Sequence, residues 1–288
     1  MAFDYQTVLN WQIPDAAQNL TRRDTMLYAL GIGLGEDPVD ERELRFVYEE
    51  GLQAFPSMAV VLAHPGFWMK DPGTGIDWAK VLHAEQSIRL HRRLPVEGRL
   101  ASRSKVSEIV DKGADKGALL YQEREILLAD TGERVATVEL VGFCRGDGGC
   151  GAPATSVRVP VALPGRDPDA ADTKTSQPHS ALLYRLSGDY NPLHADPAVA
   201  RRAGFDRPIL HGLCTLGIAL RSVFETQLGY RIDNVVGIDV RFAAPVFPGE
   251  TIRTEIWNEG DELYFRSFVP ARSALVLTNG RVMLATGA

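Results

Sequence analysis

The side chains best suited to chemistry cluster in one short segment, residues 187–194, with the sequence SGDYNPLH. It offers the carboxylate of Asp189, the amide of Asn191 and the imidazole of His194 within a few positions. Gly, Asp, Asn and Pro at this density predict a loop. A carboxylate and an imidazole on one loop can hold a water molecule between them and remove its proton. Asp and Asn before Pro are also routine turn residues, so a structural turn is the alternative.

A second motif, PILHG at residues 208–212, precedes a stretch in which apolar residues recur at helical spacing. We expect a helix over residues 213–227, with Gly229 ending it. The first N–H groups of a helix have no partner within it and lie at its positive end. If the loop at Asp189 lies beside Gly212, a water-activating pair adjoins a donor for an oxyanion.

Strands surround this helix in the sequence. Alternating apolar residues predict strands in residues 236–242, 252–256, 263–267 and 274–285, the last interrupted by a turn or bulge at Asn279-Gly280. Similar runs occur in the first half at 100–110, 117–128 and 134–143. A sheet wrapped around one apolar helix satisfies this pattern.

The two halves also match each other. LYAL at residues 27–30 matches LYRL at 183–186, and Ile88 to Val96 aligns with Ile238 to Val246 at a constant spacing of 150 positions. Several matches in the same order indicate an internal duplication. The Gly- and Pro-rich residues 145–178 predict a connection between the halves. We therefore expect a first repeat at 1–144, a linker at 145–178 and a second repeat at 179–288.

Composition restricts the class of protein. The 288 residues carry 31 Lys and Arg against 37 Asp and Glu, a net charge of −6, which argues against nucleic-acid binding. No apolar run is long enough to span a bilayer, and no signal peptide is evident. Three cysteines are too few for a disulfide framework, so a reducing, cytoplasmic location is expected. No cluster of residues resembles a metal site, and His64, His91 and His179 stand in no motif, so surface or packing roles are expected.

The motifs LSGDYNPLH at residues 186–194 and PILHGLCT at 208–215 resemble those of the MaoC-like dehydratases, or (R)-specific 2-enoyl-CoA hydratases of type 2. The first half, through MLYALGIG at 26–33 and VLHAEQ at 81–86, is similar to the non-catalytic repeat of eukaryotic-type members. The resemblance extends to the hydratase region of peroxisomal multifunctional enzymes of type 2. It implies an α+β double hot-dog fold, in which each of two antiparallel sheets wraps a helix.

The resemblance also implies a reaction, the reversible hydration of trans-2-enoyl-CoA to (R)-3-hydroxyacyl-CoA, with an acyl-CoA as substrate and no cofactor. We also expect a homodimer that binds neither nucleic acid nor membrane. Asp189 and His194 match the catalytic pair, Asn191 orients the site, and the Gly212 N–H matches the amide that holds the thioester oxygen. The residues that match substrate-lining positions are His83, Ala84, Lys112, Tyr190, Pro192, Leu193 and Phe242. Ala84 departs from the pattern, where relatives carry Gly.

Two other functions compete with this one: a dehydratase acting on acyl-carrier-protein thioesters, and a non-catalytic acyl-thioester-binding protein. The complete set of Asp189, Asn191 and His194 argues against the second, because a carrier has no need of it. In the first repeat, Pro56 and Pro65 confine the counterpart of the long helix to at most about eight residues. We expect the space this leaves to accept part of a long acyl chain.

Overall fold

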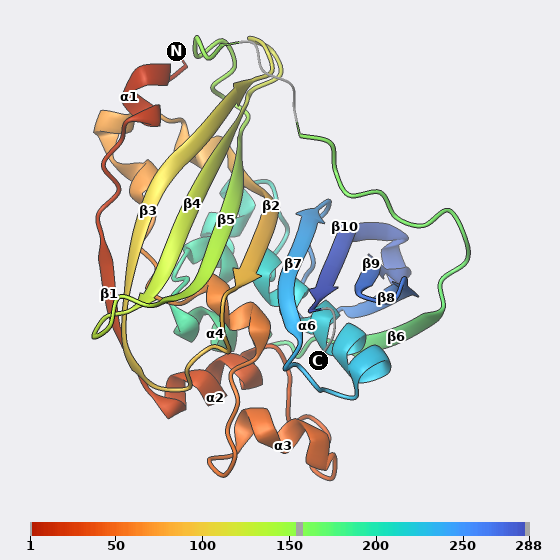
Figure 1. Ribbon diagram of the computed structural model, residues 1–288. Coiled ribbons are helices and arrows are strands. Elements are labelled where there is room, and N and C mark those ends of the chain that lie inside the picture. The colour runs from red at the N-terminus through yellow and green to blue at the C-terminus, as the bar shows by residue number, and fades with distance from the viewer. Residues whose placement is uncertain (1, 154–157, 286–288) are drawn as a thin grey trace.

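The computed structural model describes residues 2–153 and 158–285. Ten strands form one antiparallel sheet in the order β1-β3-β4-β5-β2-β7-β10-β9-β8-β6, which curves around the helices (Figure 1). In the first half the strands are β1 (Ala16–Leu20), β2 (Val81–Leu90), β3 (Gly98–Asp111), β4 (Ala118–Leu128) and β5 (Arg134–Cys144). In the second half they are β6 (Ala170–Thr175), β7 (Val235–Phe242), β8 (Thr251–Asn258), β9 (Glu262–Val269) and β10 (Ala274–Leu284).

The strand order confirms the duplication. The five strands of the second half correspond in sequence order to the five of the first, and the sheet order reads the same from either edge. At the centre, β2 pairs with β7 antiparallel, and Ile88 lies opposite Ile238, the residue 150 positions later. A pseudo-two-fold axis therefore passes between these two isoleucines. The molecule has the double hot-dog architecture, in the α+β class, that the sequence predicted.

The helices lie on the concave side of the sheet (Figure 1). They are α1 (Tyr5–Leu9), α2 (Arg22–Gly31), α3 (Glu41–Val47), α4 (Ser180–Tyr184), α5 (Pro197–Arg202) and α6 (Gly212–Val223). Helix α6 is the predicted long helix, and nearly all of its side chains are buried in the main core. It continues as a π-helical turn, Phe224–Leu228, and ends at Gly229 in the left-handed conformation, as the sequence indicated.

Helix α6 is also tied to the first repeat through a buried ion pair. The guanidinium of Arg221 lies 3.4 Å from the Glu43 carboxylate on α3 and donates to the Ile32 carbonyl at 3.1 Å. The hydroxyl of Tyr230 donates to the same carboxylate at 2.7 Å. Removing one partner of such a buried network leaves the other uncompensated, at a cost of about 3–5 kcal/mol. The first repeat thus fixes the position of the helix on which the site is built.

The first-half counterpart of α6 is short, as predicted. It is a 3₁₀ helix, η1 (Pro56–Val60), bounded by the proline at its start. Part of the remaining space is filled by Trp68 and Met69, which pack in a second apolar cluster with residues of α1, β3 and β4. The indole N–H of Trp68 donates to the side chain of Gln122 at 2.8 Å.

Two details differ from the sequence prediction. Strand β6 lies inside residues 145–178, which we had predicted to be linker, and it pairs with β8. Val236 was expected on the buried face of its strand but is 37% exposed. It sits at a register shift between β7 and β10, where Gly237 and Val235 pair with consecutive residues of β10 and Val236 has no partner. A bulge of this kind turns the extra side chain out of the alternation.

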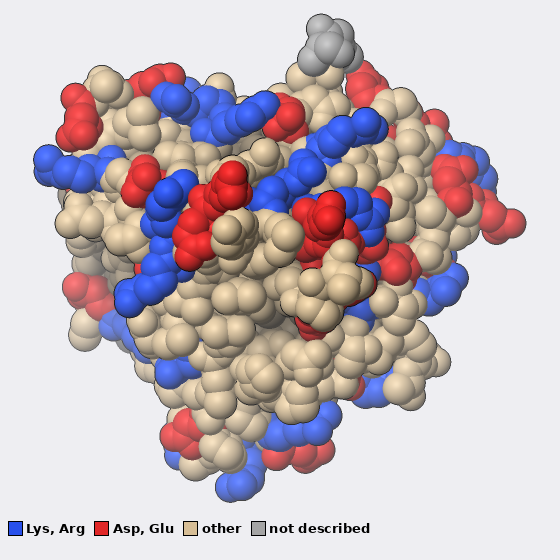
Figure 2. Space-filling view, turned by 90° about the horizontal axis from the view of Figure 1, so that it is seen from below, with Lys and Arg blue, Asp and Glu red and all other residues tan. Residues whose placement is uncertain are grey.

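Charges of both signs are mixed over the surface seen from below (Figure 2). Many of the basic side chains lie beside acidic ones, for example Arg42 beside Asp40 and Arg93 beside Asp233. This face therefore carries no broad field of a single sign. None of the helices in the described part of the chain has the length and apolar character needed to cross a membrane.

Candidate active site

The loop that carries the polar motif is shaped by its own side chains. Gly188, at φ 123°, lets the chain turn out of the helical segment that ends at Ser187. The Asp189 carboxylate then accepts the Asn191 N–H at 3.2 Å, and the Asn191 side-chain oxygen accepts the Leu193 N–H at 3.1 Å. The second bond caps a single 3₁₀ turn, Pro192–His194. Asn191 therefore fixes the turn that presents His194.

His194 is held as a neutral base. Its side chain is 9% exposed, and Nδ1 lies 2.9 Å from the carbonyl oxygen of Ile209. A carbonyl can only accept, so Nδ1 carries the proton and the neutral ring keeps its lone pair at Nε2. Burial lowers the pKa of His194 below its usual value, and the Ile209 carbonyl and the Asp189 charge oppose this only partly. The imidazole is therefore unprotonated near neutral pH.

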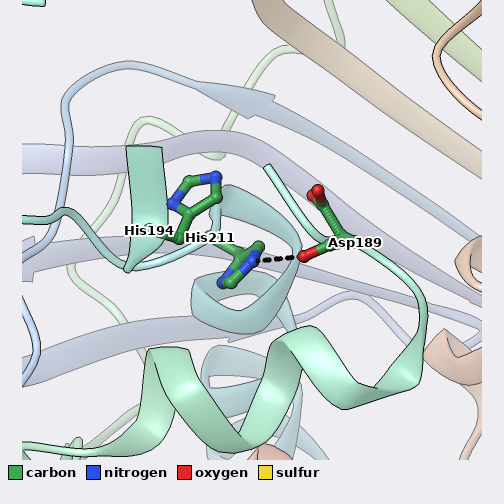
Figure 3. Close-up of side chains that lie close together, drawn as sticks. All are labelled: Asp189, His194 and His211. Atoms are coloured by element: carbon green, nitrogen blue, oxygen red, sulfur yellow. Dashed lines mark hydrogen bonds between the residues drawn. The ribbon is translucent and has the colours of Figure 1, made fainter. Parts of the chain in front are cut away.

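His211, the residue that precedes α6, completes the cluster (Figure 3). Its Nε2 donates to the backbone carbonyl of Asp189 at 3.2 Å, and its ring stacks on that of His194 with centroids 3.7 Å apart. Burial, with a further contribution from His194, lowers the pKa of His211 to about 4. In the sequence His211 is part of the PILHG motif, which by itself indicates no role for this side chain. The sequence feature that could have indicated a role for His211 is its position directly before Gly212, at the start of a predicted helix.

The three side chains are close enough to share one small ligand. One carboxylate oxygen of Asp189 and one ring nitrogen each of His194 and His211 lie within 4.8 Å of one another. The Asp189 carboxylate remains partly exposed, whereas both imidazoles are buried. A water molecule in this space can contact the carboxylate and an imidazole at once. The same donor types also suit a divalent transition metal ion.

Gly212 lies at the first position of α6, so its N–H has no acceptor within the helix. A Cβ at this position would lie 3.1 Å from the ring of Phe242 on β7, so a side chain here would push against that ring. The His83 ring, from β2, lies 4.7 Å from the Phe242 ring. Burial lowers the pKa of His83 to about 4. A hydrogen bond with the Glu85 backbone and the charge of Asp189 act in the opposite direction but do not cancel this effect. The first repeat therefore contributes His83 to the surroundings of Asp189.

The other residues matched to substrate-lining positions lie at different places. Ala84 is the extra residue of a bulge between β2 and β5, and its backbone conformation does not require glycine. Tyr190 and Pro192 are exposed on the loop, and Leu193 is half-buried. Lys112 is not brought to the cluster. Its ammonium lies 4.8 Å from the ring of Phe143, which is on the opposite face of the sheet from His83.

The pseudo-two-fold axis relates this site to a second cavity. About 340 Å³ in volume, it lies between the end of β2 and the start of β7, with Arg92 and Asp233 in its lining. Arg92 corresponds to Phe242 of the candidate site, and Asp233 corresponds to His83. The two residues of each pair are 150 positions apart, the spacing that relates the two repeats. The lining also includes Pro56, the first residue of η1. Pro56 corresponds to Gly212, the first residue of α6. It contains no counterpart of the Asp189 and His194 pair.

The duplicated sheet, with Asp189 and His194 close together near a helix N-terminus, places the protein in a class, the double hot-dog hydro-lyases of the MaoC-like type. Two family models match the chain, a MaoC-like domain over residues 160–279 and the N-terminal domain of MFE-2 hydratase 2 over residues 19–146. The chain belongs to this family of type 2 enoyl-CoA hydratases and MaoC-like dehydratases, as its motifs predicted.

Individual relatives agree with the family models. The chain is 37% identical to the peroxisomal enoyl-CoA hydratase 2 of Arabidopsis thaliana, over 96% of this chain and 94% of that protein. It is 35% identical to the mouse peroxisomal multifunctional enzyme type 2, over 95% of this chain but only 37% of that longer protein. Among solved structures, a MaoC-like dehydratase from Phytophthora capsici superimposes with a TM-score of 0.86 at 35% identity, covering 99% of this chain and 100% of that one.

Proposed function

We propose that this protein catalyses the reversible hydration of trans-2-enoyl-CoA to (R)-3-hydroxyacyl-CoA. The observation that carries the proposal is the arrangement of Asp189 and His194 beside the N-terminus of α6. Relatives that match over almost their whole length, such as the Arabidopsis protein, are named enoyl-CoA hydratases and support the same substrate class.

The geometry suggests how each group acts. An enoyl thioester is electrophilic at Cβ because its carbonyl oxygen can take up negative charge as an enolate. A water molecule held by Asp189 and His194 loses a proton to this pair as its oxygen bonds to Cβ. The free lone pair at Nε2 makes His194 able to accept that proton. The enolate then takes a proton from the pair at Cα, so that the atoms of water are added across the double bond.

In this proposal the Gly212 N–H, at the start of α6, stabilises the enolate. A donor at the start of a helix adds the positive end of the helix dipole to its hydrogen bond. Oxyanion donors of this kind contribute about 3–4 kcal/mol to transition-state stability in other enzymes. The thioester oxygen would therefore lie at Gly212, with the reacting carbons over Asp189 and His194.

Stereochemistry provides the direct test. Purified protein is incubated with trans-2-enoyl-CoA thioesters of several lengths, and the 3-hydroxyacyl product is resolved on a chiral column. The (R) enantiomer is expected. An (S) product, or no turnover at any length, would contradict the proposal.

We propose CoA rather than acyl carrier protein as the carrier of the substrate because of the charge on the protein surface. Carrier proteins of this kind are acidic and dock on basic surfaces, whereas this chain has a net charge of −6 and mixed charges on the face in Figure 2. One enoyl chain, presented on CoA and on a carrier protein, separates the two reactions. We expect a higher kcat/KM for the CoA thioester at low ionic strength, where docking on a basic patch would be strongest.

The proposed chemistry needs neither a metal ion nor a redox cofactor. Because Asp189, His194 and His211 also form a donor set for a metal, chelation is the test. Activity should survive prolonged dialysis against EDTA. Loss of activity that zinc or another divalent ion restores would show that the water is activated by a metal instead.

Two further properties are part of the proposal. The three cysteines, Cys144, Cys150 and Cys214, are unpaired and buried, which suits a reducing compartment such as the cytoplasm. We also expect a homodimer. Light scattering at micromolar concentration tests the oligomeric state, and fractionation of the source cells tests the location.

A further inference from the structure

Residues 209–212, which lead into α6, form a fixed part of the candidate active site. The N–H of Leu210, a buried residue, donates to the Val246 carbonyl at 2.7 Å, so the segment is fastened to the chain that follows β7. The carbonyl of Ile209 accepts the Nδ1–H of His194 at 2.9 Å. This short segment therefore holds one of the two proposed acid–base groups, and its last residue, the first of α6, carries the proposed oxyanion donor.

The loop that carries Asp189 is joined to this segment by His211. Nε2 of His211 donates to the backbone carbonyl of Asp189 at 3.2 Å (Figure 3). In the described part of the chain, the other hydrogen bonds of residues 188–193 are made to residues 185–196, within the loop or beside it. Tyr190, the residue after Asp189, is exposed. The bond from His211 therefore connects the Asp189 end of the loop to the start of α6, which is distant in the sequence.

His211 stands at the N-cap position of α6, yet its side chain does not cap the helix. Ser, Thr, Asp or Asn at this position usually accepts a hydrogen bond from an N–H group of the first turn. The side chain of His211 makes no such bond, and its ring is turned toward the loop instead. The first turn is thus left without a side-chain cap, which keeps its N–H groups open to a bound oxyanion.

Packing alone does not account for an imidazole at this position. The His211 ring is 1% exposed, stacks on that of His194 with centroids 3.7 Å apart, and lies 5.1 Å from the ring of Tyr184 on α4. Because Nε2 carries the proton, Nδ1 has only a lone pair, and within the described residues this buried atom has no partner. An unpaired buried nitrogen is unfavourable, and a phenyl ring would pack here without one. The bond that Nε2 makes to Asp189 explains the imidazole.

We propose that His211 is a positioning residue for the hydration reaction, which holds Asp189 and His194 in a fixed place relative to the first N–H of α6. The bond to the Asp189 backbone sets where the carboxylate lies, and the stacked ring limits the tilt of the His194 imidazole. His211 itself transfers no proton. Misplacing reacting groups by about 1 Å lowers a rate by about a hundredfold, so both contacts affect the transition state. This inference rests on the proposed hydratase activity and adds a residue to it.

Three neutral substitutions separate the two contacts. Burial, and then the nearby His194, lowers the pKa of His211 to about 4, so the ring is uncharged near pH 7 and these substitutions preserve the charge of the site. His211→Gln keeps a donor for the Asp189 carbonyl but loses the stacked ring, whereas His211→Phe keeps a ring and loses the donor. His211→Leu loses both. With a four-carbon trans-2-enoyl-CoA, kcat should fall by about a hundredfold for His211→Leu and about tenfold for each of the others, with KM within about threefold of the wild type.

Two double-mutant cycles distinguish positioning from a general structural role. If the donor of His211 acts by holding Asp189, its loss matters little once the carboxylate is gone. His211→Phe should therefore lower kcat by about tenfold in the wild type but by less than about twofold in the Asp189→Asn background. In the same way, His211→Gln should have little effect in the His194→Gln background.

Ser222→Ala is the matched control. Ser222 is buried near the C-terminal end of α6, and its hydroxyl donates to the Asp172 carboxylate at 2.7 Å. The control therefore removes a buried hydrogen bond from the same helix, away from the site. It should lower Tm, as the His211 variants do, and keep kcat within about twofold of the wild type.

The outcomes separate the two proposals. Absence of wild-type turnover on the four-carbon substrate overturns the proposed function, and this inference with it. With an active wild type, the inference about His211 alone is wrong if folded His211→Phe and His211→Gln proteins keep kcat within about twofold. It is also wrong if each substitution has the same effect in the wild type and in its matching background, because the effect would then not act through Asp189 or His194. A fall in kcat that Ser222→Ala reproduces overturns it too, since the cause would be the stability of α6.

Discussion

Replacing His194 by Gln tests the chemistry most directly, because the structure assigns each nitrogen of the ring a separate task. Nδ1 donates to the Ile209 carbonyl and Nε2 is free to take a proton. The carboxamide of Gln can still donate to that carbonyl but has no basic nitrogen. The substitution therefore removes the base and keeps the anchoring bond.

The expected size follows from these two tasks. Loss of a general acid–base group lowers kcat by about 10²–10⁴, equivalent to about 2.7–5.4 kcal/mol in the activation barrier. Loss of stability should be small. Even if the bond to Ile209 were lost, it would cost about 0.5–1.5 kcal/mol, which shifts Tm by no more than about 6 °C in a chain of this size.

The assay measures kcat and KM with a short trans-2-enoyl-CoA, following loss of the enoyl thioester absorbance, together with a thermal melt. His91→Gln serves as control, since His91 is exposed and its ring makes a hydrogen bond with the side chain of Thr137. The control should match the wild type in both measurements. A well-folded His194→Gln protein with kcat within about threefold of the wild type would refute the assigned role.

Four further outcomes follow from the same geometry. Asp189→Asn should lower kcat by about 10²–10⁴ without unfolding the protein, because the residue lies on a partly exposed loop; unchanged kcat rejects its role. Gly212→Ala keeps the N–H but displaces the Phe242 ring by a few tenths of an ångström, so kcat/KM should fall by about tenfold, less than for either pair variant. Protonation inactivates His194, and burial lowers its pKa, so kcat/KM should be constant at neutral pH and fall only below the usual histidine pKa of about 6.5; a midpoint above that value contradicts the assignment. Titration with a tight analogue of the reacting thioester should find one catalytic site per chain, because Gly33 stands in the first repeat where the sequence match places Asp189.

Much of the fold was predictable because burial on one face imposes a period of two on a strand. Strands β3, β4 and β5 were predicted to within about two residues of their observed ends. Strand β6 was missed because it does not bury one face and therefore lacks this period of two. It is an edge strand that pairs only with β8, its residues AADTKT are mostly polar, and none of its side chains is fully buried. An edge strand of this kind carries no hydrophobic period to detect.

The site was predictable only where it lies in one stretch of sequence. Asp189, Asn191 and His194 were found because local turn chemistry holds them together. His211 was not assigned a role, since its surroundings are made by segments distant in the chain. The ring of His211 meets His194 only when α6 docks beside the loop.

The duplication explains why the site is built from both halves. Two-fold pairing of β2 with β7 places the end of one repeat against the helix of the other, so each repeat forms a wall of its partner's site. In one site the second repeat supplies α6 and the loop with Asp189 and His194, and the first supplies His83. In the other, η1 replaces the long helix, and Arg93 forms an ion pair with Asp233 at the cavity. The second pocket has walls from both repeats but lacks the acid–base pair.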